Sequence, residues 1–297
     1  MLAWAKSPPR IFFLEPLIRI GLRAARQSRQ QLLSTYDRPP FNRMRRQALH
    51  NYTAGIKNKL YANIESAILS AYPSHAVVQE TPAINKSEPF TWVVKPLDGV
   101  ANFLRSLNDF CAVLGIYEDS NLRHSIVYDY LQDDEYYASQ DVGAMVNQNR
   151  LRVAKNFVHD EAIVAICKQD AMASNYSAHF QKMYALLNAS MQEIRTSGST
   201  AIDLARVARG RLDAFVTVGP PSNTVQIAQL LVKEAGGFAT EVCSSHQHES
   251  PRYFIAANPQ LSSTIGKLLG AKPVEMERLA ASSIANQVED SSRTEAP

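Results

Sequence analysis

The stretch Trp92-Val-Val-Lys-Pro-Leu-Asp-Gly-Val-Ala-Asn-Phe103 begins with residues that favour a strand and leads into a turn. Trp92, Val93 and Val94 are aromatic or β-branched, which suits a pleated and half-buried surface. Similar runs follow it, separated by turn residues, at 112–117, 125–130 and 135–139. This spacing predicts an antiparallel sheet that extends outward from the quoted stretch.

Helical patterns flank this predicted sheet. On its N-terminal side, apolar residues recur at helical intervals over 11–34 and 56–71, and prolines follow both segments. On its C-terminal side, a strand pattern at 162–166 precedes helical patterns at 179–188, 200–208 and 224–235. Alternation of this kind is typical of an α/β fold. We therefore predict a helix-plus-antiparallel-sheet half at 1–155, an α/β half at 156–272 and a disordered tail at 273–297.

Composition excludes several classes of protein. The chain has 297 residues, of which 45% are hydrophobic, so it can bury one large core or two modest ones. Cys111, Cys167 and Cys243 form no C-x-x-C pair, so we expect neither a disulfide scaffold nor a zinc knuckle. We therefore predict that the protein is located in the reducing environment of the cytoplasm. No apolar run approaches the roughly 18 residues of a membrane span, and residues 1–10 lack the pattern of a signal peptide.

Basic residues are concentrated near the N-terminus. Residues 1–50 contain ten Lys and Arg against Glu15 and Asp37, a balance of +8, although the whole chain carries only +3. The pattern has three interpretations: a solvated helix face, a contact with RNA or an acidic protein, or binding to a membrane surface. It contains no sign of DNA sequence recognition. The candidate partner contacts are Arg19, Arg23, Arg26, Arg43, Arg45 and Arg46.

Two further groups of residues are explained by local structure. Asp133, Asp134 and Glu135 are neighbours at a predicted hairpin, where turn chemistry accounts for acidic residues. Gly236-Gly237 follows a predicted helix, so we expect it to end that helix and to let the next strand pack closely.

Four segments resemble signatures of the inositol monophosphatases. That family carries W-[VI]-[VI]-D-P-[IL]-D-G-T-x-N-F where this chain has 92–103, and the two Asp side chains of the signature hold catalytic Mg²⁺. Segments 72–81, 194–204 and 230–237 are similar to the family's Y-P-x-H-x-x-[IL]-x-E-E, R-x-x-G-[ST]-A-A-x-[DN]-[LM] and final W-D motifs. The resemblance implies a layered α-β-α-β-α sandwich and a homodimer.

The chain departs from these signatures at metal and substrate positions. Lys95 replaces the first Asp of the quoted stretch, and Val100 replaces the Thr that helps to orient the attacking water. Thr81 stands where a Glu binds metal, and Thr224 stands where the final motif has its Asp. Other departures are Asn51 and Lys57, at two usual acids, and Thr217, at a Glu that contacts an inositol hydroxyl. Glu80 and Asp98 are retained.

These departures predict the loss of the metal site. Mg²⁺ prefers carboxylate, phosphate and water oxygens as ligands. An ammonium about 4 Å from a divalent ion is repelled by roughly 8 kcal/mol at an effective dielectric of about 20. We therefore expect the protein to bind no cofactor; if it is active, we expect it to bind Mg²⁺. We hypothesise that the Lys95 ammonium replaces the metal cation and pairs with Asp98 and Glu80.

The backbone around the lost site could still bind an anion. Exposed N–H groups at the start of a helix bind phosphate without a metal. By resemblance, the residues of this remnant are Gly99, Ser197, Gly198, Ser199, Thr200 and Thr217.

Two functions follow from the resemblance. The first is a non-catalytic regulator of the SuhB branch of the family, whose members contact Nus factors and RNA polymerase in ribosomal RNA antitermination, with Arg195 as a candidate contact. The second is an active Mg²⁺-dependent inositol or sugar phosphatase that uses Glu80 and Asp98 in a rearranged site.

Overall fold

The computed structural model of the chain describes residues 15–36, 44–79, 88–155, 158–167, 176–219, 221–243 and 252–270. Its first sheet has the order β1-β2-β3-β4-β5-β6-β7, with β1 parallel to β2 and the other neighbours antiparallel. The strands are β1 (Ala76–Gln79), β2 (Thr91–Asp98), β3 (Cys111–Glu118), β4 (Asn121–Asp129), β5 (Asp134–Ser139), β6 (Gly143–Val146) and β7 (Asn149–Arg150). The predicted sheet around Trp92 is confirmed.

The second sheet has the order β11-β12-β10-β8-β9. Its strands are β8 (Ile163–Cys167), β9 (Glu193–Arg195), β10 (Ala214–Val218), β11 (Phe238–Cys243) and β12 (Arg252–Ala257). β8 is parallel to β9 and β10, while β12 is antiparallel to both of its neighbours. A short 3₁₀ turn, η1 (His159–Glu161), leads from the first sheet into the second.

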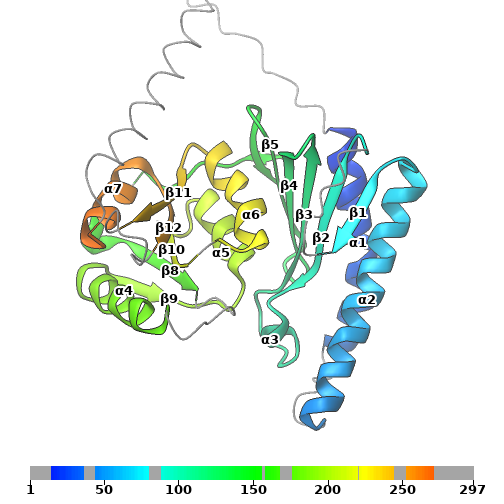
Figure 1. Ribbon diagram of the computed structural model, residues 1–297, viewed down its shortest axis with the longest axis horizontal. Coiled ribbons are helices and arrows are strands. Elements are labelled where there is room, and N and C mark those ends of the chain that lie inside the picture. The colour runs from blue at the N-terminus through cyan, green and yellow to red at the C-terminus, as the bar shows by residue number, and fades with distance from the viewer. Residues whose placement is uncertain are drawn as a thin grey trace, which may run out of the picture.

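The helices lie in layers around these sheets, as Figure 1 shows. They are α1 (Pro16–Tyr36), α2 (Arg46–Ala71), α3 (Val100–Phe103), α4 (Ser177–Ser190), α5 (Thr200–Ala208), α6 (Asn223–Glu234) and α7 (Pro259–Leu268). α1 and α2 cover the outer face of the first sheet, α5 and α6 separate the sheets, and α4 and α7 cover the second sheet. The predicted α-β-α-β-α sandwich is therefore confirmed.

The sequence of each helix accounts for its layer. α5 reads Thr-Ala-Ile-Asp-Leu-Ala-Arg-Val-Ala, and all but Thr200 and Arg206 are buried. A helix that is apolar nearly all round belongs inside a protein, and small alanines let both sheets approach it. α1 has an apolar face that buries Ile18, Leu22 and Leu32 against the first sheet, and its other face is polar. It therefore forms an outer layer.

The structure corrects the predicted start of the second helix. α2 begins at Arg46, ten residues before the predicted Ile56. Asn51, Thr53 and Gly55 are weak helix formers, which concealed this part of the helix. Leu49, Tyr52 and Ile56 recur at helical spacing and pack partly buried against the cluster beneath α1, so tertiary packing holds the additional turns.

Several predictions fall outside the described residues. They concern the first residues of the helix predicted over 11–34 and the disordered tail predicted at 273–297. They also concern the retained Glu80, the substituted Thr81 and the candidate contact Arg43. Within the described ranges, no helix combines the length and hydrophobicity needed to cross a membrane.

Candidate functional site

Lys95 lies on β2 and points toward the start of α6. Its Nζ atom is 2.9 Å from Asp98 Oδ1 and donates a hydrogen bond of 2.9 Å to Thr224 Oγ1. The pairing of β2 with β3 shifts register between Lys95 and Asp98, and this irregularity brings the two side chains of one strand together. The hypothesised pairing of Lys95 with Asp98 is confirmed; its second partner, Glu80, is not among the described residues.

Asp98 is bound from the opposite side by the start of α5. Its Oδ2 atom accepts hydrogen bonds from Ser199 Oγ at 2.7 Å and from the Ala201 N–H at 3.3 Å. The side chain is only 9% exposed. A buried carboxylate needs charged or hydrogen-bonding partners, and an ammonium, a hydroxyl and a helix-start N–H supply them here. These contacts join the first sheet to the layer of α5 and α6.

The first turn of α6 forms the other wall of the site. Ser222 caps this helix, because its hydroxyl accepts from the Val225 N–H, and Thr224 is buried in the first turn. A cavity of about 210 Å³ lies between this turn and β2. It is lined by Val93, Lys95, Ser222, Asn223, Thr224 and Ile227.

The turn that leads into α5 is fixed by Asn102. Its Nδ2 atom donates to the carbonyl oxygens of Asp109 and Ser197, both at 2.8 Å. Gly198 has φ +85°, and a Cβ atom there would lie 3.0 Å from Asn102 Oδ1. Ser197 Oγ accepts from the Ser199 N–H, which closes the turn. α5 then starts at Thr200, as the sequence predicts.

All four hydroxyls of the predicted anion-binding remnant are engaged with protein atoms: Ser199 Oγ donates to Asp98, and Ser197 Oγ donates to the Ser199 carbonyl oxygen. Thr217 is fully buried and donates to the Cys167 carbonyl oxygen at 2.9 Å. Thr200 donates to Cys167 Sγ at 3.1 Å. Gly99, at φ +75°, is enclosed by the Asp109 carbonyl oxygen, and Val100 follows it as the first residue of α3. In this conformation Thr217 presents no group to a ligand.

The chain matches a known protein family over most of its length. The model of the inositol monophosphatase family matches residues 14–283. The chain belongs to the inositol monophosphatase family.

Relatives in this family include proteins named Nus factor SuhB. Nus factor SuhB of Pseudomonas aeruginosa is 28% identical over 251 residues, which cover 82% of this chain and 92% of that protein. Nus factor SuhB of Escherichia coli K12 is 26% identical over 250 residues, with 84% and 93% coverage. This chain is therefore a SuhB-like member of the family.

Solved structures share its fold. The extragenic suppressor protein suhB of Bartonella henselae superposes with a TM-score of 0.70 at 22% identity, covering 85% of this chain and 98% of that one. The inositol monophosphatase of Thermotoga maritima gives a TM-score of 0.68 at 21% identity, with 85% and 96% coverage.

The residues present do not fit the Mg²⁺ ion of the inositol monophosphatase signature. Lys95 and Thr224 occupy two positions where the signature has acids, and the Lys95 ammonium contacts Asp98 directly. Mg²⁺ needs oxygen ligands at about 2.1 Å, which the ammonium excludes by charge and by volume. Throughout the part of the chain that the structure describes, no three His, Cys, Asp or Glu side chains are grouped to hold a metal.

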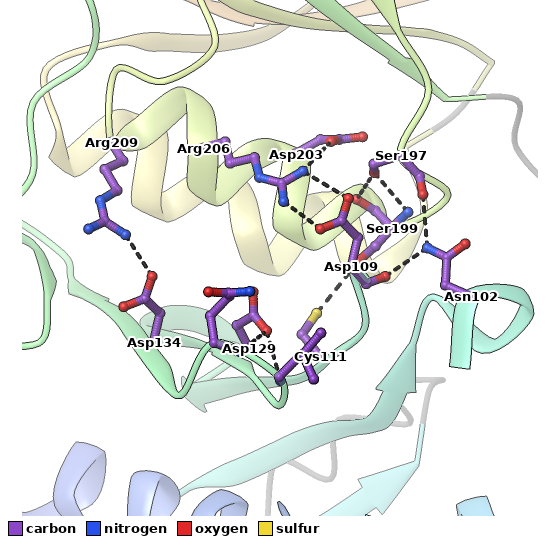
Figure 2. A network of polar contacts seen from close by, with 12 residues as sticks. Asn102, Asp109, Cys111, Asp129, Asp134, Ser197, Ser199, Asp203, Arg206 and Arg209 are labelled. Carbon is purple, nitrogen blue, oxygen red and sulfur yellow. Dashed lines mark hydrogen bonds and ion pairs between the residues drawn. The ribbon is translucent and has the colours of Figure 1, made fainter. Parts of the chain in front are cut away.

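A network of ion pairs that the sequence did not reveal lies beside this site (Figure 2). Arg206 of α5 makes two contacts with Asp109, one of them 3.0 Å long, and lies 4.0 Å from Asp203. Burial raises the pKa of Asp203 to about 7, while a hydrogen bond from Ser197 and the charge of Arg206 oppose this rise. These residues border a cavity of about 480 Å³.

The acidic hairpin is also held by arginines. Arg209 Nη1 donates to Asp134 Oδ2 at 2.6 Å, Arg29 Nε lies 3.7 Å from Asp133, and Arg26 forms two hydrogen bonds with Glu135. Turn chemistry alone therefore does not explain these acids. The partners are 75 to 109 residues apart in sequence, so no local pattern indicated these pairs.

The remaining candidate contact residues differ in whether their side chains are paired within the protein. Arg26 is engaged with Glu135, so its side chain is committed within the protein. Arg195 lies 2.9 Å from Glu193 in a pair that is half exposed or more. Arg19 and Arg23 on α1, and Arg45 and Arg46 at the start of α2, are exposed.

Proposed function

We propose that this SuhB-like protein does not hydrolyse phosphate esters with Mg²⁺ and that it works by binding other macromolecules. The observation that carries the proposal is the contact of Lys95 with Asp98 and Thr224. A cation is already present at this position, and it is part of the polypeptide.

The chemistry of phosphoryl transfer supports the proposal. Bound metal ions neutralise the charge that develops on the phosphoryl oxygens and activate the attacking water. The Lys95 ammonium carries one charge and already contacts Asp98 and Thr224. Val100 has no hydroxyl with which to orient a water molecule. These features support the proposed loss of Mg²⁺-dependent hydrolysis.

The binding role rests on similarity. Relatives at 26–28% identity are named Nus factors, and we infer that this chain likewise contacts a Nus factor or RNA polymerase in the cytoplasm. We also infer a homodimer. Arg45, Arg46 and Arg195 remain candidate contacts, since their side chains are exposed.

The phosphatase assay tests the first part of the proposal. Hydrolysis of inositol 1-phosphate is measured across a Mg²⁺ titration for the wild-type protein and for Asp98→Ala prepared in the same way. We expect both preparations to show the same background rate. Mg²⁺-dependent turnover that disappears in Asp98→Ala would establish the competing function, an active phosphatase, which the retention of a buried Asp98 favours.

Direct binding tests the second part. Purified RNA polymerase and Nus factors are immobilised separately, and retention of the protein is compared with retention of an Arg45→Glu/Arg46→Glu/Arg195→Glu variant. We expect retention of the wild-type protein and a loss in the variant; no retention on any of these partners would refute the regulator. Sedimentation velocity on the same samples distinguishes dimer from monomer.

A further inference from the structure

A basic groove runs between α1 and α2 on the outer face of the molecule. A cavity of about 450 Å³ there is lined by Arg23, Gln27, Asn63, Ser66, Ala67 and Ser70. The two helices are fixed to each other by a hydrogen bond of 2.6 Å from Asn63 Nδ2 to Gln31 Oε1. We call this feature, together with Arg19 and Lys59, the helical groove.

Helical spacing places the flanking cations along the helical groove. On α1, Arg19 precedes Arg23 by four residues and so lies on the same face, one turn away. On α2, Lys59 precedes Asn63 by four residues and continues the row formed by Asn63, Ser66 and Ser70. This row is about 16 Å long at 1.5 Å per residue.

The cations of the helical groove are available to a partner. Arg19, Arg23 and Lys59 are exposed, and no hydrogen bond or ion pair joins their side chains to another described residue. Arg26 and Arg29 on the same helix differ, because they bind Glu135 and the Tyr130 carbonyl oxygen. The described acids of this helical layer are Glu15, one turn before Arg19, and Glu65, which accepts from Tyr61 on α2. The groove is therefore positively charged.

The chemistry of its lining indicates the partner. Arginine, lysine, amide and hydroxyl side chains are the groups that contact phosphate and sugar in nucleic acids. The exposed large apolar residues of the described chain are Met44, Leu107, Val142, Val158 and Tyr184, and none lies on α1 or α2. The layer thus lacks the buried aromatic anchor of a protein interface and the aromatic platform on which unpaired bases stack.

We propose that the helical groove binds the sugar–phosphate backbone of double-stranded RNA without reading its sequence. The cations contact phosphates, and the short hydroxyl and amide side chains of the groove contact 2′-hydroxyls, which are the groups that distinguish RNA from DNA. This proposal adds a ligand class to the binding role proposed above. RNA binding by the helical groove does not depend on whether the Lys95 site is catalytically inactive, so each proposal can be refuted without the other.

Fluorescence anisotropy tests the proposal with labelled duplexes of about 20 base pairs, longer than the groove. The full chain is titrated against an RNA duplex and the DNA duplex of the same sequence at several salt concentrations. The test variant is Arg19→Gln/Arg23→Gln/Lys59→Gln. The matched control, Lys182→Gln/Arg211→Gln/Lys267→Gln, removes the same charge from exposed cations elsewhere.

We expect the test variant to bind the RNA duplex at least about 10-fold more weakly at low salt, with a slope of log K against log salt that is less steep by about 3. The control variant should keep the slope of the wild-type protein. Glu15→Gln should tighten binding, because it removes the acid beside Arg19, and this variant tests the groove without weakening the fold.

Three results would overturn the proposal. They are no binding of the RNA duplex at low salt, an equal loss in the control variant, and equal affinity for DNA and RNA. Displacement of bound RNA by an acidic peptide, with peptide binding that is tighter than RNA binding, would assign the groove to an acidic protein instead.

Discussion

Arg209 Nη1 lies 2.6 Å from Asp134 Oδ2, so the residue that follows α5 is tied directly to the first residue of β5. The two side chains are 26% and 17% exposed, which removes much of the screening by water. Arg209 also lies 5.9 Å from the centre of the Tyr136 ring. This contact links the helix between the sheets to the β4–β5 hairpin of the first sheet.

We predict that a double-mutant cycle of Arg209→Ala and Asp134→Ala gives a coupling energy of about 1 kcal/mol in urea unfolding. The control is the cycle of Arg195→Ala and Glu193→Ala, whose side chains are 60% and 50% exposed. For this exposed pair we expect less than about 0.5 kcal/mol, because water and salt screen it. Equal coupling in both cycles would show that partial burial adds nothing to the Arg209 contact.

Removing the Lys95 ammonium should destabilise the protein. Lys95→Ala leaves the nearly buried Asp98 carboxylate without its cation, and we expect a loss of about 3 kcal/mol in the free energy of unfolding. Lys95→Ala/Asp98→Ala should be more stable than Lys95→Ala alone, since no charge is then stranded. Lys182→Ala, at an exposed lysine, should change stability by less than about 0.5 kcal/mol. A Lys95→Ala protein as stable as this control would contradict the role assigned to the pair.

Asp203 should make stability depend on pH. Burial raises the pKa of its carboxyl from 3.8 to about 7, so between these values the folded state holds a proton that the unfolded state releases. This contribution is fully present below about pH 4 and is lost as pH rises toward 7, with a slope of at most about 1.4 kcal/mol per pH unit.

Asp203→Asn tests this dependence. The variant cannot ionise, so its stability relative to the wild-type protein should rise between pH 4 and 7 and then stay constant. Chemical unfolding at several pH values measures the difference. The exposed Asp160→Asn serves as the control and should follow the wild-type curve. A constant difference between Asp203→Asn and wild type would mean that Asp203 is ionised throughout.

Gly99 and Gly55 should respond in opposite directions to alanine. Gly99 has φ +75°, and a Cβ atom there would lie 2.3 Å from the Asp109 carbonyl oxygen. We expect Gly99→Ala to cost about 3 kcal/mol, from backbone strain and the clash. Gly55 lies within α2 with no atom within 4 Å of its Cβ position, so Gly55→Ala should stabilise by about 0.5–1 kcal/mol. Thermal unfolding measures the stability of both variants relative to the wild-type protein. A Gly99→Ala variant as stable as the wild-type protein would contradict the strained turn.

Patterns within single segments predicted much of the fold. The start and end of α5 at Thr200 and Ala208 follow from its apolar run, and the left-handed Gly236 follows α6 as the Gly-Gly pair indicates. Gly237 packs closely, because a Cβ atom there would lie 2.8 Å from Val153 and Val232 side chains. The buried strands β10 and β12 were not predicted. Short apolar runs do not distinguish a buried strand from a helix.

The site was predicted in part for a similar reason. The pairing of Lys95 with Asp98 was expected from the resemblance, because Lys95 replaces one metal-binding Asp of the signature and Asp98 is the other. Their spacing alone would not predict it, since strand side chains three residues apart normally point to opposite faces, and the register shift between them brings them together. Arg206 and Asp109 are 97 residues apart, and no local pattern joins them. Arg26 was interpreted as a surface contact, but the fold brings Glu135 to it.

The Lys95 contact also has a consequence for the conditions in which the fold persists. A metal ion exchanges with the pool dissolved around a protein, and its occupancy follows the concentration of that pool. The Lys95 ammonium is carried by the same strand as Asp98 and cannot diffuse away. The junction between the first sheet and the helices behind it therefore keeps its charge balance in the presence of a chelator and through any change in the supply of divalent ions.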